Sequence, residues 1–409
     1  MISIRSILLC LMLTLSVTVQ GKALVSIALM PSSQQQKEVL VKALNSFEKS
    51  QSEIAVKTRF YEPEEFKGNI QTLLSSPKEK IDVFIWFAGQ RLSELITADL
   101  VEPIDNLWSP EEWTSVFSAA SLSAVKRNEH VYALPLYYYQ WGFYYRKSLL
   151  RSMSLSAPKT WDDLITSCKV LGKASLTPIA LGTQAEWPAL AWFDYVNLRT
   201  NGLAFHHSLL SGQDSFADPR VEAVFSQLEE LVKLNCFNTN SPQLSWKEAA
   251  SLMTAKQAGL FLMGNFFTPN IPEEVRADIG FVRFPEITPK LPLFEDAPLD
   301  ILMVNKNSTA SKESIYKLLT HFSDASIQGA LAAGTGKIPP NKHAFVSHDR
   351  LIVDGIELLN QAEGSAQFFD RDAPSTLSAI AKQVLSKFLA GQISKEEAIN
   401  TLKNTPVAP

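Results

Sequence analysis

A continuous apolar run, IDVFIWF at 81–87, constrains the fold of this chain more than any other feature. A strand with one solvated face alternates apolar and polar residues, so an unbroken run indicates a strand that is covered on both faces. The segments before it alternate in kind. Residues 24–29 and 54–60 have the pattern of strands, whereas 34–49 carries an apolar stripe at helical spacing. Strands that alternate with helices predict α/β layers with largely parallel sheets.

Helix starts are marked by four predicted capping boxes. In this motif a serine or threonine and an acidic residue three positions later satisfy two free backbone N–H groups. Residues 218–234 form a predicted amphipathic helix, and Asp372 is predicted to cap a last long helix that runs to about Ala390. The four boxes are Ser109 with Glu112, Thr160 with Asp163, Ser245 with Glu248, and Ser394 with Glu397.

The first residues indicate export. Arg5 precedes an apolar run at 7–19, and small residues follow at Gly21 and Ala23. This run has the length of a signal-peptide core and is shorter than the ~20 residues that span a bilayer. We therefore expect residues 1–21 to be a signal peptide and the remaining chain to be a soluble periplasmic protein.

The net charge limits the classes of partner that we expect, and the number of cysteines limits the possible disulfides. The net charge of −4 argues against nucleic acid as a partner, because phosphate binding needs a basic surface. After residue 21 the chain keeps two cysteines, Cys168 and Cys236. A fold of this size does not need disulfides for stability. We expect two buried thiols at these positions rather than a disulfide.

The most unusual segment is YALPLYYYQWGFYY at 132–145. Strand side chains alternate between faces, so Tyr137, Tyr138 and Tyr139 cannot all point into one apolar core. A tyrosine also carries a hydroxyl that needs a polar partner when it is buried. Part of this cluster, with Tyr137, Tyr139 and Trp141 as candidates, is expected to face a ligand cleft; core packing alone is the alternative. A flat ring of this kind could cover the C–H face of a sugar.

Further candidates lie outside that segment. Trp86, Trp187 and Phe266 fall at predicted strand ends or in loops, where they could also cover a sugar ring. Trp161 and Trp246 fall in the first turns of predicted helices and are expected to pack beside the caps.

Two polar segments could hold the rim of sugar hydroxyls. The turn LPLFEDAPLD at 291–300 offers Asp296 and Asp300, and FFDRD at 368–372 offers Asp370 and Arg371. A surface ion pair is an equally good interpretation of Asp370 and Arg371.

Signals for catalysis are weak. The chain has no Gly-x-Ser-x-Gly elbow, and the GTGK run at 334–337 lacks the spacing of a phosphate-binding loop. A glycosidase would need one perturbed carboxylate pair across the scissile bond, and no pair stands out. We expect no catalytic residue, no metal site and no cofactor.

A series of motifs, taken in order, resembles the extracellular solute-binding proteins, family 1, of carbohydrate ABC transporters. The resemblance covers roughly residues 24–402, and it rests on the order of the motifs rather than on any single one. The motifs are IDVFIWFAGQRLSELITADLVEPID at 81–105, VYALPLYYYQWGFYYRKSLL at 131–150, PKTWDDL at 158–164, PIALG at 178–182, KQAGLFLMGNF at 256–266, VNKNS at 304–308, KIPPNK at 337–342 and FFDRD at 368–372.

The resemblance implies a periplasmic-binding-protein fold of type II-like form, with two α/β lobes joined by hinge crossings around a ligand cleft. We expect residues 22–134 plus 286–336 in the N-terminal lobe and 135–285 plus 337–409 in the C-terminal lobe. Trp86, Tyr139, Trp187 and Phe266 fall where relatives place sugar-contacting residues. Two departures matter. Tyr139 stands where maltose-binding members carry a glutamate, and Phe266 stands where tryptophan is usual.

The implied function is capture of a sugar or oligosaccharide and its delivery to the permease subunits of an ABC importer, by a protein expected to be monomeric. A ligand-dependent partner of a periplasmic sensor domain is the alternative. A periplasmic carbohydrate-active enzyme is a remote third possibility.

Overall fold

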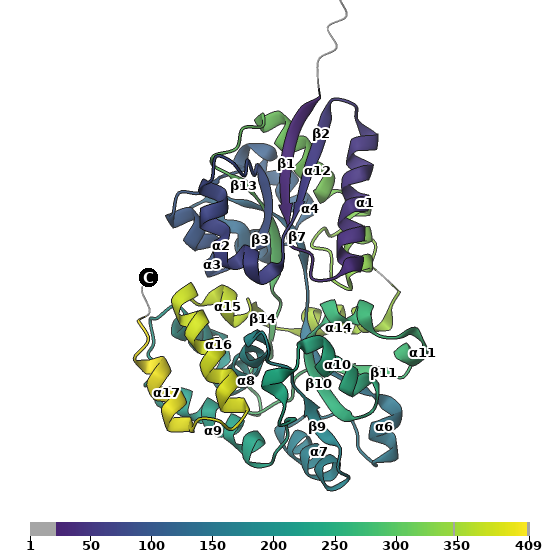
Figure 1. Ribbon diagram of the computed structural model, residues 1–409, viewed down its shortest axis with the longest axis vertical. Coiled ribbons are helices and arrows are strands. Elements are labelled where there is room, and N and C mark those ends of the chain that lie inside the picture. The colour runs from purple at the N-terminus through teal and green to yellow at the C-terminus, as the bar shows by residue number, and fades with distance from the viewer. Residues whose placement is uncertain (1–21, 347, 407–409) are drawn as a thin grey trace, which may run out of the picture.

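The computed structural model describes residues 22–346 and 348–406, which form two lobes, one above the other in Figure 1. The expected signal peptide, residues 1–21, lies outside the described residues. The sheet of the first lobe has the strand order β2-β1-β3-β13-β4, with β7 also paired to β13. Its strands are β1 (Ala23–Leu29), β2 (Ile54–Phe60), β3 (Val83–Phe87), β4 (Val101–Glu102), β7 (Ala133–Tyr138) and β13 (Leu299–Asn305).

Helices cover this first sheet, and β3 is buried along its whole length, as the unbroken apolar run predicts. β1, β2 and β3 are parallel, but β13 is antiparallel to β3, β4 and β7. The sheet is therefore mixed rather than largely parallel. The helices of this lobe include α1 (Gln34–Ser50), α2 (Pro63–Ser75), α3 (Gln90–Thr97), α12 (Lys312–Ser323) and α13 (Ala325–Thr335).

The second lobe is built on the sheet β11-β8-β10-β9, which is also mixed because β8 is antiparallel to both of its neighbours. These strands are β8 (Trp141–Arg146), β9 (Thr177–Ala180), β10 (Ala258–Gly264) and β11 (Ile279–Val282). The surrounding helices include α7 (Trp161–Lys173), α8 (Leu190–Leu210), α9 (Pro219–Lys233), α10 (Trp246–Thr254), α14 (Arg350–Gln361), α15 (Phe369–Asp372), α16 (Ser375–Leu389) and α17 (Lys395–Lys403). Among the described helices, none combines the length and the apolar character that a membrane crossing would require.

The two lobes are joined by hydrogen-bonded crossing segments. Tyr138 N–H donates to Ile338 O (3.0 Å), Ile338 N–H donates to Tyr138 O (2.8 Å), and Tyr139 N–H donates to Pro298 O (3.3 Å). Three stretches distant in sequence therefore lie side by side where the lobes meet. Short crossings of this kind absorb the backbone rotation when lobes open and close.

The strand pairings move the lobe boundaries away from the expected ones. β7 stays in the first sheet through Tyr138, four residues beyond the expected end of that segment at 134, because it pairs with β13 along its length. Glu286 pairs with Lys159 and Thr160, so the chain is still in the second lobe at 286. Asn341 forms a bridge with Phe117, which keeps residues after 336 in the first lobe.

The helix caps follow the sequence with one exception. The capping boxes at Ser109, Thr160 and Ser245 are complete, and Ser394 accepts a hydrogen bond from Glu397 N–H. Asp372, however, does not cap the last long helices. It ends the short helix α15, and its carboxylate accepts from Gln367 N–H (3.0 Å), while α16 starts after Pro374. The proline breaks the helix because its ring disfavours helical backbone in the residue before it.

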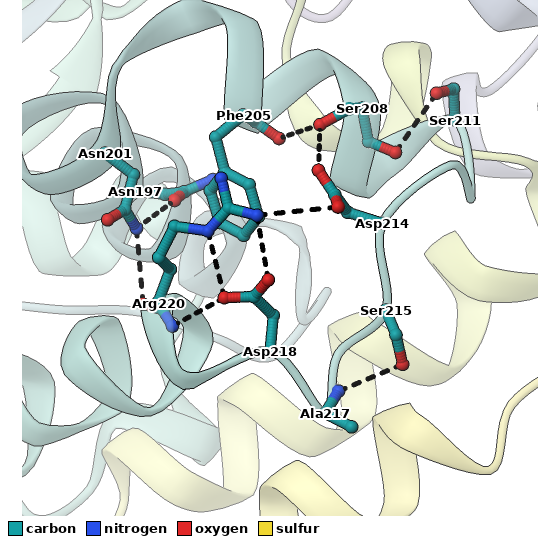
Figure 2. A network of polar contacts seen from close by, with 10 residues as sticks. All are labelled: Asn197, Asn201, Phe205, Ser208, Ser211, Asp214, Ser215, Ala217, Asp218 and Arg220. Atoms are coloured by element: carbon teal, nitrogen blue, oxygen red, sulfur yellow. Dashed lines mark hydrogen bonds and ion pairs between the residues drawn. The ribbon is translucent and has the colours of Figure 1, made fainter.

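A polar network fixes the corner between α8 and α9 (Figure 2). Asp218 caps α9, and its carboxylate accepts hydrogen bonds from Arg220 Nε (2.9 Å) and Nη2 (2.8 Å). The Arg220 guanidinium lies 3.7 Å from the ring centroid of Phe205 on α8. Asn201 donates to Arg220 O (3.2 Å). The network thus connects the second half of α8 to the start of α9, while the other end of α8 begins at Leu190, three residues after Trp187.

The two cysteines form a disulfide, so the expectation of two free thiols is wrong. Cys168 on α7 is bonded to Cys236, which lies three residues after the end of α9, and their Cα atoms lie 5.4 Å apart. Ile179 of β9 pairs with the Cys236–Phe237 backbone, and α7 packs on β9. The two cysteines are 68 residues apart in sequence, so no local pattern predicts that they meet. They meet because α7 and the segment after α9 both pack beside β9.

Candidate functional site

A cavity of ≈ 390 Å³ lies between the lobes and is lined by both of them. The first lobe contributes the β1–α1 turn, the start of α2, the end of β3 and parts of β7 and β13. The second lobe contributes β8, the segment before α8, the start of α10, the segment after β10 and α15. The lining residues include Met30, Gln36, Glu62, Lys67, Ile85, Phe87, Tyr137, Asp300 and Lys337 from the first lobe, and Tyr139, Trp141, Trp187, Trp246, Phe266, Phe368, Asp370 and Arg371 from the second lobe and the crossing segments.

Three charged side chains form the most buried polar part of the cavity, and we name Asp300, Lys337 and Arg371 the charged triad. Lys337 Nζ lies 2.7 Å from Asp300 Oδ2, and Arg371 lies 3.0 Å from Asp300 Oδ1. All three side chains are at most 7% exposed. Arg371 also donates to the Tyr139 hydroxyl. Because burial makes a lone charge very costly, one carboxylate between two cations is what allows these charges to lie here.

Burial and neighbouring charges shift the pKa values of these groups. Burial lowers the pKa of Lys337, and the nearby Asp300 carboxylate opposes this shift. Burial also raises the pKa of Tyr139, so its hydroxyl is protonated at neutral pH. Burial would raise the pKa of Asp370, but cations, with Lys67 and Arg91 the strongest, hold the pKa of this carboxyl below its usual value. The cavity therefore offers protonated tyrosine and ammonium donors together with carboxylate acceptors.

In the first lobe, a hydrogen bond from Gln36, next to the turn between β1 and α1, positions Tyr137. The side-chain oxygen of Gln36 accepts from Ser32 N–H (2.6 Å) and from the Ser32 hydroxyl (2.8 Å). Its amide nitrogen donates to the Tyr137 hydroxyl (3.1 Å). The Tyr137 ring is fully buried, and Lys337 Nζ lies 3.9 Å from its centroid. Tyr137 thus has a polar partner for its hydroxyl and a cation over its face.

The second lobe presents a group of rings that we call the aromatic wall: Trp141, Trp187, Trp246, Phe266 and Phe368. Trp141 stacks on Phe368 with ring centroids 4.9 Å apart and 11° between the planes. Trp187 meets Trp141 at 6.0 Å and 80°, and Trp246 meets Phe266 at 5.6 Å and 86°. Edge-to-face and stacked contacts are the favoured arrangements of such rings. They leave a continuous apolar surface in the cavity.

The structure brings eight of the ten predicted site residues into this cavity. They come from five separate segments and are Tyr137, Tyr139, Trp141, Trp187, Phe266, Asp300, Asp370 and Arg371. Asp370 and Arg371 are not an isolated surface ion pair, because both are buried and line the cavity.

Trp86 does not line the cavity. It is 2% exposed, packs against Phe66 and Phe87, and donates from Nε1 to Arg91 O (3.1 Å) within the first lobe. Side chains alternate along a strand, so Ile85 and Phe87 of β3 face the cavity and Trp86 faces the opposite side. The end of this strand therefore reaches the cavity through Ile85 and Phe87 and not through Trp86.

Asp296 also lies outside the cavity. It is fully buried in β12 (Phe294–Asp296), beside the ion pair between Arg199 and Glu295 (2.6 Å). Neither of its carboxylate oxygens has a hydrogen-bond partner among the described residues. Burial, reinforced by Asp372 and Glu295, raises the pKa of Asp296 well above its usual value. The interior of the second lobe therefore favours the protonated form of Asp296.

Sequence reasoning missed several lining residues. Trp246 was assigned to packing beside its cap, yet it stands at the start of α10 and faces the cavity. Phe87, Lys337 and Phe368 each lie within a motif that the sequence singled out, but no local pattern distinguishes them from their neighbours. Among the described residues, no cluster of three or more histidine, cysteine or acidic side chains is arranged to hold a metal ion.

Comparison with known proteins agrees with this architecture. Residues 30–328 match the model of the family described as bacterial extracellular solute-binding protein. An uncharacterised ABC transporter extracellular-binding protein of Pyrococcus horikoshii is 26% identical over 289 residues, 70% of this chain and 65% of that protein. A probable sugar-binding periplasmic protein of Mesorhizobium japonicum is 24% identical over 267 residues, 63% of each chain. The matched regions thus span slightly less than two thirds of these relatives.

Solved structures share the fold. The bacterial solute receptor AcbH, described as having an exclusive preference for β-D-galactopyranose, superimposes with a TM-score of 0.86 at 24% identity, over 94% of this chain and 98% of that one. A chitin oligosaccharide binding protein superimposes with a TM-score of 0.83 at 20% identity, over 93% and 97%. With its two lobes, its interlobe cavity and a family match over most of its length, this chain belongs to the family of bacterial extracellular solute-binding proteins.

Proposed function

We propose that this chain is an exported sugar-binding protein that captures its ligand in the interlobe cavity and delivers it to the permease of an ABC importer. One observation carries the proposal: the aromatic wall of the second lobe and the buried charged triad line the same cavity. A sugar ring has an apolar face of C–H groups and a rim of hydroxyls. Pockets that combine aromatic surface with a few placed polar groups suit such a ligand.

The charges of the cavity favour a neutral sugar. Within the described lining, four cationic side chains are balanced by four anionic ones, so the other lining residues offset the single positive charge that the charged triad keeps. A uronic acid or an amino sugar would add one uncompensated charge to this enclosed space, which is costly. The balanced residues are Lys67, Lys247, Lys337 and Arg371 against Glu62, Glu64, Asp300 and Asp370.

The same geometry supports the proposal of binding rather than catalysis. The carboxylate of Asp300, which lines the cavity, is engaged by the two cations Lys337 and Arg371. The relatives named above are binding proteins. A sugar that touches both lobes stabilises the closed form, which a permease could then recognise.

Calorimetric titration tests the proposal with neutral hexoses, pentoses and oligosaccharides, and with galacturonate and glucosamine as charged comparisons. We expect saturable binding of at least one neutral sugar and weaker binding of its charged analogues. Trp187→Ala should weaken binding by about 1 kcal/mol or more, because an aromatic contact is lost. Trp108→Ala is the matched control, since Trp108 packs against Trp113 in the first lobe, away from the cavity. A folded protein that binds no sugar would refute the proposal.

A further inference from the structure

One helix end in the second lobe is capped by the first lobe. The N-cap position of α16 is Pro374, and it offers no side-chain hydrogen bond to the first turn. The first N–H groups of a helix have no partner within the helix. Here Glu94 Oε1, on α3 of the first lobe, accepts from Ser375 N–H at 2.8 Å. The carboxylate also suits the positive end of the helix dipole.

Two further contacts join the same elements, which face each other across the lobes in Figure 1. Arg91 of α3 donates from Nε to Asp370 O of α15 at 2.7 Å, and it lies 3.6 Å from Glu94. Gly89, directly before α3, has φ +82°, and a Cβ atom there would lie 2.6 Å from Arg371 O. Only glycine tolerates both this backbone angle and this close approach. We call the contacts of Gly89, Arg91 and Glu94 with α15 and α16 the interlobe clasp.

The clasp adjoins the cavity without lining it. Asp370 and Arg371 project side chains into the cavity, while Arg91 and Glu94 hold the backbone of α15 and the start of α16 from outside. A rotation of the lobes about the crossing segments would move α3 relative to α15 and α16 and separate these donors from their acceptors. The clasp is therefore a property of the closed arrangement.

We propose that Arg91 and Glu94 are positioning residues whose interlobe contacts set the population of the closed form, and so the affinity for every ligand of the cavity alike. The proposal rests on the function proposed above and deepens it. A protein that binds ligand only in its closed form has an affinity proportional to the closed fraction. Contacts that touch the other lobe, but not the ligand, change that fraction without changing selectivity.

The experiment compares Arg91→Ala and Glu94→Ala with the wild-type chain by calorimetry on every sugar that the wild type binds. We expect each variant to weaken binding about three- to tenfold, by the same factor for each sugar. Ligand-free X-ray scattering should show a larger radius of gyration. Glu94→Gln keeps a side-chain oxygen that can accept from Ser375 and should lose less than Glu94→Ala. Glu313→Ala is the control, because Glu313 is exposed and pairs with Lys317 on its own helix.

Unchanged affinity and unchanged scattering in both alanine variants, with melting curves that show folded protein, would overturn the clasp. Losses that differ from sugar to sugar would also overturn it, because they would mean that Arg91 or Glu94 acts on the ligand, directly or through the cavity-lining Asp370, rather than on the closed fraction. If the wild-type chain binds no sugar, the proposed function fails. The clasp is then judged by scattering alone, and identical profiles for wild type and variants would reject it.

Discussion

Asp300→Asn is the most informative perturbation of the charged triad. In the folded chain the Asp300 carboxylate lies 2.7 Å from Lys337 Nζ and 3.0 Å from Arg371, and all three side chains are almost fully buried. The amide is nearly isosteric, so packing is preserved, but two buried cations lose their counter-charge. Breaking a buried ion pair by removing one partner costs about 3–5 kcal/mol. The asparagine oxygen can still accept one hydrogen bond, so we expect a loss of about 3 kcal/mol at neutral pH.

Urea denaturation followed by tryptophan fluorescence measures this loss as a lower midpoint at unchanged slope. Adding Lys337→Met to Asp300→Asn removes one of the two unpaired cations and should recover part of the stability. Glu313→Gln, on an exposed pair with Lys317, should leave the midpoint unchanged, because exposed ion pairs contribute little. A loss below about 1 kcal/mol for Asp300→Asn, or no recovery in the double variant, would refute the electrostatic account of the triad.

Three further predictions concern the rest of the fold. Cys236→Ser should lower the free energy of unfolding by about 2–4 kcal/mol, because the disulfide to Cys168 is lost. Dithiothreitol should destabilise the wild type but not this variant. Equal sensitivity of both chains to the reductant would contradict the disulfide. Gly355→Ala should destabilise α14 by about 1–3 kcal/mol, because the new Cβ would lie 2.0 Å from Gln140 Nε2, whereas Gly68→Ala on α2, with open space around it, should be neutral or stabilising. The same effect at both glycines would show that packing at Gly355 is not the cause. Because the pKa of Asp296 is raised, the folded chain holds this proton more tightly than the unfolded chain does. The resulting stabilisation is complete below the unfolded pKa near ~4, and it is lost as the pH rises through the folded pKa. Asp296→Asn should therefore raise the urea midpoint at pH 7 and flatten its fall between pH 4.5 and 8, and an unchanged slope would rule out Asp296 as the titrating group.

Local features were readable from the sequence because they depend on near neighbours. The caps at Ser109, Thr160 and Ser245 and the buried strand β3 need only residues within a few positions to form. The tyrosine-rich segment predicted a polar or solvated surrounding for part of the cluster, because side chains alternate between the faces of a strand, and Tyr137 and Tyr139 do line the interlobe cavity. The order of motifs pointed to two lobes, and the family match and the shared fold confirm that architecture.

The errors share a different cause. Trp86 was predicted to face a sugar, but its neighbours Ile85 and Phe87 line the cavity, and the register of this strand is fixed by pairing with β13, more than 200 positions later. Trp246 has the same local context as a tryptophan packed beside its cap, and only the position of the first lobe opposite α10 turns its ring into a cavity wall. The lobe boundaries shifted for a similar reason, because Asn341 pairs with Phe117.

The sequence by itself determined the alternation of strands and helices and most of the helix caps, and it singled out aromatic residues that line the interlobe cavity. The tertiary structure decided which of those rings face the cavity, that Cys168 meets Cys236, and that Lys337 and Arg371 share the carboxylate of Asp300. The physical reason is range. Backbone propensities and caps act over one or two turns, whereas burial and charge pairing depend on groups that only the folding of both lobes brings within a few ångströms.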